Sequence, residues 1–263
     1  MRHSVFTYQT AIGTSTVYQF AKPHPKNMNY KPDSTTALPL YLQLSEFLIR
    51  EISAGRMADS DKLSPEREMA IQHGTTVTTL RKALAVLQDK GLLERKHGSG
   101  NYVRRAKQVE SVYSMFRLEL KQGGGLPTSR ILGVTEMKKP SDLPIFGTSD
   151  HGTRIRRLRF LDTTPIAVEE IWLDLDSGKV DPDQLQDSLY RFYKMQLGFW
   201  ISRAEDRVAI GFVPDWAPTE FGVNTGTAVG FIERFSWAQI TNPVEYSRTW
   251  FNADKATYIQ RLI

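Results

Sequence analysis

Apolar residues recur at intervals of three and four from position 40 onward. They are Leu40, Leu44, Phe47, Leu48 and Ile52, and Gly55 follows them. This spacing predicts a helix with one apolar side, which ends at the glycine. Residues 1–36 show no such pattern and contain Pro23, Pro25 and Pro32. We expect them to form a disordered tail, and Met28 is an alternative start of translation.

Two shorter helices and a hairpin are predicted next. Ser64-Pro65-Glu66 supplies an N-cap, a first-turn proline and an early acidic residue for a helix through about Gln72. A third helix starts near Thr76 and directs three leucines inward before Gly91. Two extended pieces then flank the glycine-rich sequence 97–100, which predicts a hairpin. Three helices and a basic hairpin form the layout of a winged helix-turn-helix over residues 37–104.

The second half of the chain is rich in β-branched and aromatic residues. The predicted elements are strands over 153–160, 166–173, 203–212, 228–239 and 244–251, helices over 184–196 and 217–221, and a turn at 242–243. Strands joined mainly by hairpins indicate an α+β domain on an antiparallel sheet over residues 127–263. Residues 105–126 are expected to form a linker. Their triple glycine lacks the Gly-Lys-Ser/Thr ending of a phosphate-binding loop.

Composition and charge narrow the class of protein. The chain has no cysteine, so it forms no disulfide and no thiolate metal site, and no metal or cofactor is expected. No apolar run approaches the roughly 20 residues of a membrane helix, and the first residues lack a signal-peptide core, so we expect a cytoplasmic protein. Residues 1–110 hold 16 Lys and Arg against 10 Asp and Glu, whereas the remainder holds 18 against 19. The basic excess in the first part favours a polyanionic partner there, although a chance excess on a solvated surface would look the same.

Several separated motifs in this part resemble the GntR family of bacterial transcription regulators. Residues 39–44 (PLYLQL) match the family's opening helix, and residues 63–68 (LSPERE) stand where the family usually has Leu-Pro-Ser-Glu-Arg-Glu. Residues 79–84 (TLRKAL) and 97–103 (HGSGNYV) match its recognition helix and wing. The resemblance implies a DNA-binding domain, and the exchanged order of Ser64 and Pro65 alters a helix cap rather than a DNA contact.

The resemblance and the chemistry of the side chains together give a set of candidate DNA-binding residues. They are Arg67, Thr76, Thr78, Thr79, Arg81, Lys82, Lys96, His97 and Gly98. A recognition helix enters the major groove with its first turns, where hydroxyl groups and the Arg81 guanidinium can reach phosphates or base edges. Gly98 allows the wing backbone a close approach. The alternative for each charged residue is a solvated surface group, and Thr76 could serve as an N-cap.

Val77 departs from the family pattern. Many family members have an arginine at this position, between two threonines. Valine cannot form a hydrogen bond with a base, but it can pack against a thymine methyl group. The sequence therefore predicts an operator that differs from the common family operator.

The second half resembles the UTRA effector domain of the HutC branch of that family, whose fold is like that of chorismate lyase. The resemblance rests on residues 129–132 (SRIL), 157–159 (RLR), 188–190 (SLY) and 243–246 (PVEY), together with Pro165 and Glu169. It implies a pocket that binds a small molecule. Phe251-Asn252 departs from the pattern, because many members have Tyr-Arg there.

The candidate effector-binding residues follow from these motifs. They are Arg157, Arg159, Glu169, Ser188, Tyr190 and Glu245. Alternating arginines on a strand point to the same face and suit capture of a phosphate or carboxylate, and a serine at a helix start adds a donor where the helix dipole favours an anion. The alternative is a surface ion pair between the arginines and Glu169 or Glu170. Arg154 and Arg156 are expected to be solvated. Most of the remaining aromatic residues, Phe199, Trp200, Trp237 and Trp250, are expected in the core.

The resemblance implies a transcription repressor that binds a palindromic DNA operator as a homodimer and responds to a small anionic effector. A sugar phosphate, a phosphonate or a carboxylate would each suit a pair of arginines. One alternative is an enzyme acting on a small anion, as in chorismate lyase. His151 is the single histidine of the second half, which leaves little for nucleophilic or metal chemistry, so no catalytic residue is assigned. Another alternative is a DNA-binding protein without a ligand.

Overall fold

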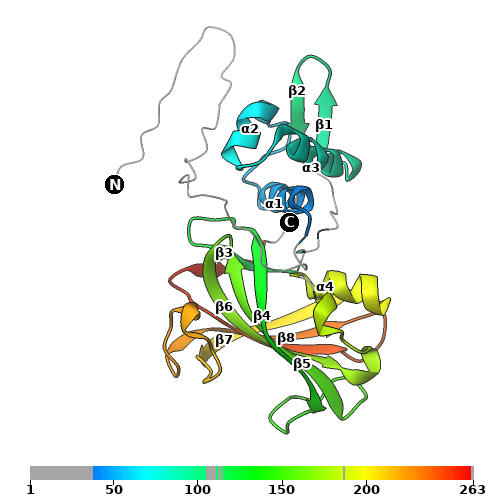
Figure 1. The fold of residues 1–263 in the computed structure, drawn as a ribbon, viewed down its shortest axis with the longest axis vertical. Coiled ribbons are helices and arrows are strands. Elements are labelled where there is room, and N and C mark those ends of the chain that lie inside the picture. Colours follow the sequence, from blue (N-terminus) through cyan, green and yellow to red (C-terminus); the bar gives the residue numbers. More distant parts are fainter. Residues whose placement is uncertain (1–37, 105–110, 112, 114, 186, 262–263) are drawn as a thin grey trace.

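The computed structural model describes residues 38–104, 111, 113, 115–185 and 187–261. The tail expected over residues 1–36, with Met28, lies outside the described residues. The first part forms a winged helix (Figure 1). Its elements are α1 (Leu40–Ser53), α2 (Glu66–Gln72), α3 (Val77–Asp89), β1 (Leu93–Lys96) and β2 (Gly100–Val103). The three predicted helices and the hairpin therefore all form.

The starts of α2 and α3 differ in how they are capped. The expected N-cap at Ser64 is wrong, because α2 begins one residue later and Pro65 occupies the cap position without a side-chain hydrogen bond. In contrast, Thr76 caps α3, and its hydroxyl accepts a hydrogen bond from the Thr79 N–H at 3.1 Å. A side-chain cap satisfies an N–H that the first turn of a helix leaves unpaired.

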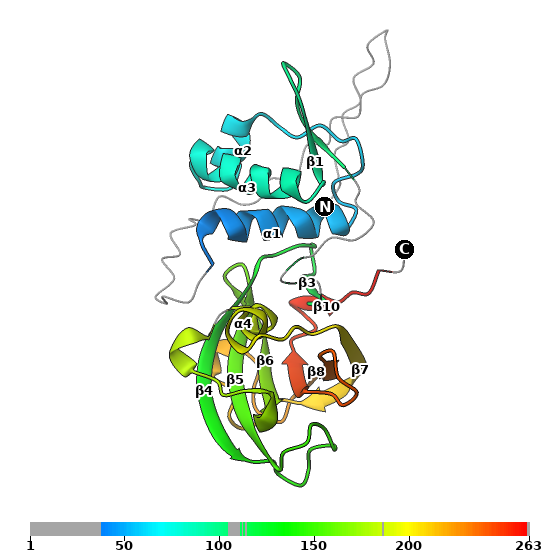
Figure 2. The same cartoon turned by 90° about the vertical axis from the view of Figure 1, so that its right-hand side faces the viewer.

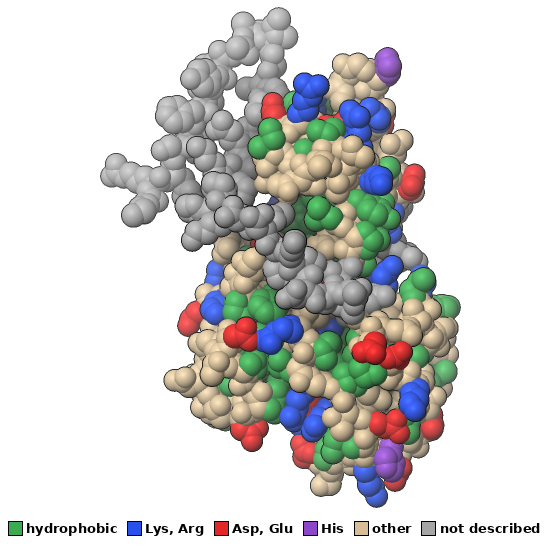
Figure 3. Space-filling view, viewed as in Figure 1, with side chains coloured by type: hydrophobic (Ala, Val, Ile, Leu, Met, Phe, Trp, Pro, Cys, Tyr) green, Lys and Arg blue, Asp and Glu red, His purple; other side chains and the backbone are tan. Residues whose placement is uncertain are grey.

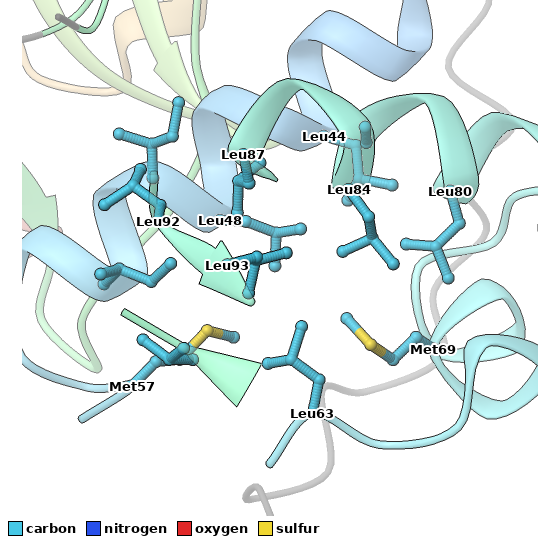
Figure 4. Close-up of a cluster of buried hydrophobic side chains, with 14 of the residues drawn as sticks. Leu44, Leu48, Met57, Leu63, Met69, Leu80, Leu84, Leu87, Leu92 and Leu93 are labelled. Carbon is cyan, nitrogen blue, oxygen red and sulfur yellow. The ribbon is translucent and has the colours of Figure 1, made fainter. Parts of the chain in front are cut away.

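The core of the winged helix is built from the apolar sides of all three helices (Figure 4). Leu48 of α1 and Leu80 and Leu87 of α3 are completely buried. The hairpin adds Leu93 and Val103 to the same cluster. Burial of one leucine side chain contributes about 1.5–3 kcal/mol to folding. Since α1 and α3 share this core, a displacement of α1 would carry α3 with it.

The second part is a six-stranded antiparallel sheet in the order β4-β5-β6-β9-β8-β7. Its strands are β4 (Pro127–Lys138), β5 (His151–Leu161), β6 (Thr164–Asp174), β7 (Arg203–Phe212), β8 (Ala228–Trp237) and β9 (Glu245–Phe251). The expectation of an α+β protein with an antiparallel sheet is confirmed. Five of the six strands match the predicted ones to within a few residues at either end.

Several elements differ from the sequence prediction. Strand β4 was not predicted, because a bulge between Ile131 and Gly133 interrupts its alternation. The helix predicted over 184–196 is wrong in extent. The structure has a 3₁₀ turn η2 (Pro182–Gln184), the one-turn helix α4 (Leu189–Phe192) and a π-helical turn η3 (Tyr193–Leu197). Two separate caps, at Asp181 and Ser188, start the first two of these pieces.

One 3₁₀ turn lies where a helix was predicted, and another follows strand β6. The helix predicted over 217–221 is only the 3₁₀ turn η4 (Thr219–Phe221), which Gly222 ends in a left-handed conformation. Strand β6 is followed by the 3₁₀ turn η1 (Leu175–Ser177). No helix of the described residues is long and apolar enough to cross a membrane.

A small second sheet lies between the winged helix and the main sheet. Strand β3 (Leu118–Leu120) pairs with β10 (Ala256–Tyr258), and both lie next to α1 in the turned view (Figure 2). The structure thus has a strand within the segment expected to be a plain linker over 105–126. The division of the chain at residues 104 and 127 remains a prediction.

Candidate DNA-binding surface and ligand cavity

The predicted DNA-binding residues lie at one end of the molecule, on α2, the first turns of α3 and the hairpin. In the space-filling view, Lys and Arg side chains gather at this end (Figure 3). Most of the nine predicted residues are exposed, and Thr79 is half-buried. Their arrangement leaves the amino-terminal half of α3 and the tip of the wing open to a large partner. Their contacts with DNA remain a prediction.

Arg81 is held in place by an ion pair with the preceding helix. Its Nε lies 2.6 Å from Oε2 of Glu66, while 63% of the arginine side chain remains exposed. An ion pair this exposed contributes about 0–1 kcal/mol to stability. Its main effect is to orient the guanidinium. The N–H groups that do not bond to Glu66 are available to a phosphate or a guanine.

The threonines at the start of α3 share one hydrogen-bonded cap. The hydroxyl groups of Thr76 and Thr79 are 2.9 Å apart, and Thr76 also accepts from the Thr79 backbone. Thr78 is exposed on the next position. Val77 is half-buried and packs against the core of the winged helix. The structure therefore gives Val77 a packing role, and its contact with a thymine methyl group remains a prediction.

The wing is a tight hairpin with glycine at the positions that need a left-handed backbone. Gly98 has a φ of 71°, and an added Cβ there would meet no other atom within 4 Å, so the backbone conformation alone requires glycine. Behind the tip, the ammonium group of Lys96 lies 4.7 Å from the centre of the Tyr102 ring, and the Tyr102 hydroxyl is 2.7 Å from that of Ser99. These contacts stiffen a strand pair that is otherwise short.

A cavity opens on the face of the main sheet that α4 covers. It encloses about 710 Å³ of space, part of which is open solvent at its mouth. All six predicted effector-binding residues line it, and they come from β5, β6, β9 and the start of α4. The structure therefore brings the six residues together, whereas their role in binding an effector remains a prediction.

Arg157 and Glu169 form a buried ion pair at the bottom of the cavity. They occupy facing positions on β5 and β6, and both the Nε and the Nη2 of the arginine donate to Glu169 Oε2, at 3.1 and 2.7 Å. Burial raises the pKa of Glu169, but Arg157 and Arg159 lower it further, so the carboxyl has a pKa below its ordinary value. The alternative of a surface ion pair is wrong in one respect, because this pair is buried.

Arg159 has fewer partners than its neighbour. Its side chain is 4% exposed, and its Nη1 donates to the Asp187 carbonyl at 3.0 Å. Its Nε is buried, and no hydrogen-bond acceptor among the described residues reaches it. The nearest charge is Glu169, whose Oε2 lies 3.7 Å from that nitrogen. Desolvation lowers the pKa of Arg159 from its ordinary value. A buried guanidinium with an unused donor is costly and favours an additional acceptor.

Glu245 is the centre of a hydroxyl network at the opposite side of the cavity. It accepts hydrogen bonds from Tyr193 at 2.6 Å, from Ser236 at 2.8 Å and from Tyr190 at 3.3 Å. Burial raises the pKa of Glu245 above its ordinary value. These bonds use both of its carboxyl oxygens, so the structure favours Glu245 as a support for the Tyr190 hydroxyl over Glu245 as a direct ligand.

Ser188 caps α4, and its Oγ accepts a hydrogen bond from the Arg191 N–H at 3.3 Å. The helix that it starts has a single α-helical turn. The turn continues directly into η3, and the expected contribution of a helix dipole at Ser188 remains a prediction. Asp187 precedes Ser188, and its backbone carbonyl accepts a hydrogen bond from Arg157 and another from Arg159.

Several cavity residues were not predicted. Arg234 of β8 lies in the cavity and pairs with Asp206 through Nε and Nη2, at 2.5 and 2.7 Å. Ser247 and Thr249 of β9 add hydroxyl groups. They alternate with Glu245 along a predicted strand, so the two-residue period of that strand would have placed them on the same face. The segment before β3 supplies a further wall, which no pattern in the sequence predicted.

Two arginines expected to be solvated have partners on the opposite face of the sheet. Arg156 forms an ion pair with Glu170, at 2.7 Å from its Nη2, and its guanidinium lies 4.6 Å from the centre of the Trp216 ring. Arg154 lies over Trp172, at 5.9 Å. The expectation was wrong because the opposite face of β5 packs against large aromatic side chains instead of facing water.

The four aromatic residues expected in the core divide. Trp250 is buried, Phe199 stacks on Tyr193 at 5.1 Å between ring centres, and Trp237 is half-buried. The expectation is wrong for Trp200, which is 52% exposed. In the part of the chain that the structure describes, no group of three or more His, Asp or Glu residues is placed to hold a metal ion.

Two family models match the chain. The model of the bacterial regulatory proteins of the gntR family covers residues 40–103, and the UTRA domain model covers residues 122–257. The chain belongs to the GntR family and carries a UTRA domain. The winged helix and the cavity-bearing sheet described above are these two domains.

Curated relatives match nearly their whole length. The transcriptional regulator SmoD of Agrobacterium fabrum is 51% identical over 86% of this chain and 97% of its own. The transcriptional repressor NagR of Bacillus subtilis is 27% identical over 84% and 94%, and the mannosyl-D-glycerate transport/metabolism system repressor MngR of Escherichia coli is 25% identical over 82% and 92%. The protein is therefore a DNA-binding transcription regulator that responds to a small molecule. The expectation that it is not an enzyme is confirmed.

Proposed function

We propose that this GntR-family regulator is a repressor that binds a palindromic operator as a homodimer and that a small anionic effector in the UTRA cavity controls this binding. Two of the relatives described above are named repressors. Two-fold symmetry lets two winged helices read the two halves of a palindrome. Such a regulator acts on the chromosome, in the cytoplasm of the bacterium.

The observation that carries the proposed effector class is the buried Arg159 guanidinium. Arg159 lines the cavity, and its buried Nε has no acceptor among the described residues. Its neighbour Arg157 has two donors on Glu169. An incoming phosphate or carboxylate supplies the acceptor that Arg159 lacks, and charge-assisted bonds of this kind are among the stronger ones in proteins. A neutral ligand would bring no charge to Arg159, whose nearest carboxylate, Glu169, is already hydrogen-bonded to Arg157.

The rest of the cavity favours a ligand that also bears hydroxyl groups. Tyr190, Ser247 and Thr249 line the walls beside the arginines, and Arg234 adds a second cationic side. Hydroxyl side chains both donate and accept, so they suit a polyhydroxy compound better than an apolar one. Sugar phosphates, phosphonates and sugar-linked carboxylates combine these features. The name of the relative MngR pairs a sugar with glycerate in the same way.

DNA binding is assigned to α3 and its neighbours. Arg81 and Thr78 at the start of α3 would contact base edges or phosphates in the major groove, supported by Arg67 and Lys82. Lys96, His97 and Gly98 at the wing would approach the adjacent groove. Effector binding would change the placement of the two winged helices, for which a coupling of about 1–3 kcal/mol is typical.

The proposed effector site is tested by a thermal-shift screen of anionic metabolites on the full-length protein. A metabolite that binds the folded protein raises the melting temperature by mass action. The same screen is run on Arg159→Met and on Arg156→Met, whose arginine lies on the opposite face of β5. We expect a metabolite that stabilises the wild type and Arg156→Met and leaves Arg159→Met unchanged.

The metabolite so identified is then added to the protein bound to DNA selected from random sequence. The proposal requires that it releases the selected operator from the wild type and not from Arg159→Met. An Arg159→Met protein that responds like the wild type would show that the anion binds elsewhere. Conversion of a screened metabolite into a product by the protein would indicate an enzyme instead.

A further inference from the structure

The segment before β3 contacts both domains. Residues 113 and 115–118 form one wall of the ligand cavity. The same segment is held to α1 of the winged helix at two points. Ser111 donates to Glu46 Oε2 at 2.6 Å, and Arg50 donates through Nη2 to the Leu118 carbonyl at 3.1 Å. A change in the shape of the cavity wall therefore acts on α1 without passing through the rest of the sheet.

One aromatic ring in this segment lies between a cavity arginine and a helix arginine. The guanidinium carbon of Arg159 is 4.7 Å from the centre of the Phe116 ring, and that of Arg50 is 5.3 Å from it. Both distances are within the range of a cation–π interaction. The cavity and the DNA-binding domain thus each contribute a cation to the same ring.

Both cations are poorly satisfied. The Nε atoms of Arg50 and Arg159 are buried, and neither has a hydrogen-bond acceptor among the described residues. Desolvation lowers the pKa of each guanidinium from its ordinary value. A buried guanidinium with an unused donor is stabilised when a further acceptor reaches it.

We propose that Phe116 couples the cavity to the DNA-binding domain, with Arg159 and Arg50 as its two contacts. This inference rests on the proposed function, because it takes the cavity as the effector site. An anion in the cavity bonds to Arg159 and draws its guanidinium away from the ring. Phe116 and the segment around it then change position, and Arg50 transmits the change to α1. Because α1 shares its core with α3, the recognition helix moves as well.

The test uses amide hydrogen exchange of α1 in the full-length protein, without a ligand and without DNA. Arg159→Met removes the cation from the cavity side, and Phe116→Leu removes the ring. Arg159→Met is expected to speed exchange in α1 by about threefold, which is the size expected for loss of one cation–π contact, and Phe116→Leu by more, because its ring contacts both Arg159 and Arg50. The double variant should exchange no faster than Phe116→Leu alone, because both changes remove the same contact.

Two matched variants serve as controls. Arg156→Met removes an arginine of the same strand that lies over Trp216, at 4.6 Å, on the opposite face of β5 from Arg159. Phe116→Tyr keeps the ring. Both are expected to leave exchange in α1 as in the wild type. Peptides of β6 and melting temperatures measured on every variant separate a local effect on α1 from general loosening of the fold.

The proposal is overturned if Arg159→Met leaves exchange in α1 unchanged. It is also overturned if Arg156→Met speeds α1 equally, if the acceleration extends over β6, or if Arg159→Met and Phe116→Leu add. These outcomes do not depend on the metabolite screen. The coupling through Phe116 can therefore be refuted while Arg159 still proves to bind an anion. If the screen finds no metabolite, the hydrogen-exchange result still tests the coupling.

Discussion

At the scale of single residues, Arg157 and Arg159 show how position on a strand separates two identical side chains. Both point into the cavity and both donate to the Asp187 carbonyl. Arg157 lies directly opposite Glu169, whereas Arg159 lies opposite Ala167. The first arginine is therefore neutralised by the protein, and the second keeps an unused donor. This difference makes Arg159 the better candidate for the first contact with an anion.

The six cavity residues could be predicted from the motifs of the family, four of them on predicted strands and two, Ser188 and Tyr190, on a predicted helix. Arg234 was not predicted, because the family motifs found in the sequence include no residue of the strand predicted over 228–239. Phe116 lies outside the predicted strands and helices. Its importance comes from two arginines that are far away in sequence, and contacts of that kind cannot be read from periodicity.

Arg81 is expected to contribute directly to operator binding. Arg81→Ala should weaken binding to a selected operator by about 1–3 kcal/mol and relax its sequence preference, because a bidentate contact of the guanidinium is lost. Affinity is measured by titration of labelled DNA at fixed salt concentration. Binding of the metabolite in the absence of DNA should be unaffected.

A matched control is Arg207→Ala. Its arginine is also 63% exposed and also pairs with a glutamate, but it lies on β7 of the UTRA domain. It removes the same charge from the protein. If both variants lose affinity equally, the effect is one of total charge, and the assignment of Arg81 is wrong.

At the scale of elements, the first turn of α3 depends on a single capping side chain. Thr76→Ala is expected to lower the free energy of unfolding by about 1 kcal/mol, because the Thr79 N–H loses its acceptor. Thr76→Ser keeps the hydroxyl group and should stay close to the wild type. Unfolding in urea, followed by circular dichroism, measures both. Equal stability of the alanine variant would mean that water satisfies the N–H equally well.

Elements with a regular spacing of apolar residues could be predicted, whereas strands that form mainly through pairing with another strand could not. The winged helix has amphipathic helices and glycines at its ends, so its order could be read from the sequence. Strand β4 carries a bulge. Strands β3 and β10 have three residues each, which is too few to show an alternation of apolar and polar residues. Residues 184–196 were predicted as one helix, whereas the caps at Asp181 and Ser188 start separate pieces in this region.

At the scale of the whole molecule, Glu119 ties the two domains and the last segment of the chain together. It accepts hydrogen bonds from Arg56 at 2.8 Å and from Arg261 at 2.6 Å. Burial raises the pKa of Glu119, but the hydrogen bonds from Arg261 and Arg56 lower it further, to about 2. A carboxyl with a lowered pKa stabilises the folded state above its ordinary pKa and loses this effect as the pH falls toward the lowered value.

Glu119→Gln is therefore expected to lower the melting temperature at pH 7, and the difference from the wild type should shrink as the pH falls from about 4.5 to 2. Melting curves over this range measure it. Glu220→Gln, whose carboxyl pairs with Arg130 on the surface, serves as the control and should follow the wild type. A difference that stays constant down to pH 2 would mean that the charge of Glu119 is not what stabilises the domain contact.

The pairing of β3 with β10 also has a consequence for how the protein is made. Strand β10 follows all six strands of the main sheet in the chain, whereas β3 precedes them. During synthesis the winged helix can fold while most of the chain is still on the ribosome, because domains generally fold from the amino-terminal end. The segment that links it to the cavity cannot be fixed until β10 emerges. A newly made regulator thus gains its DNA-binding domain first and its means of control last.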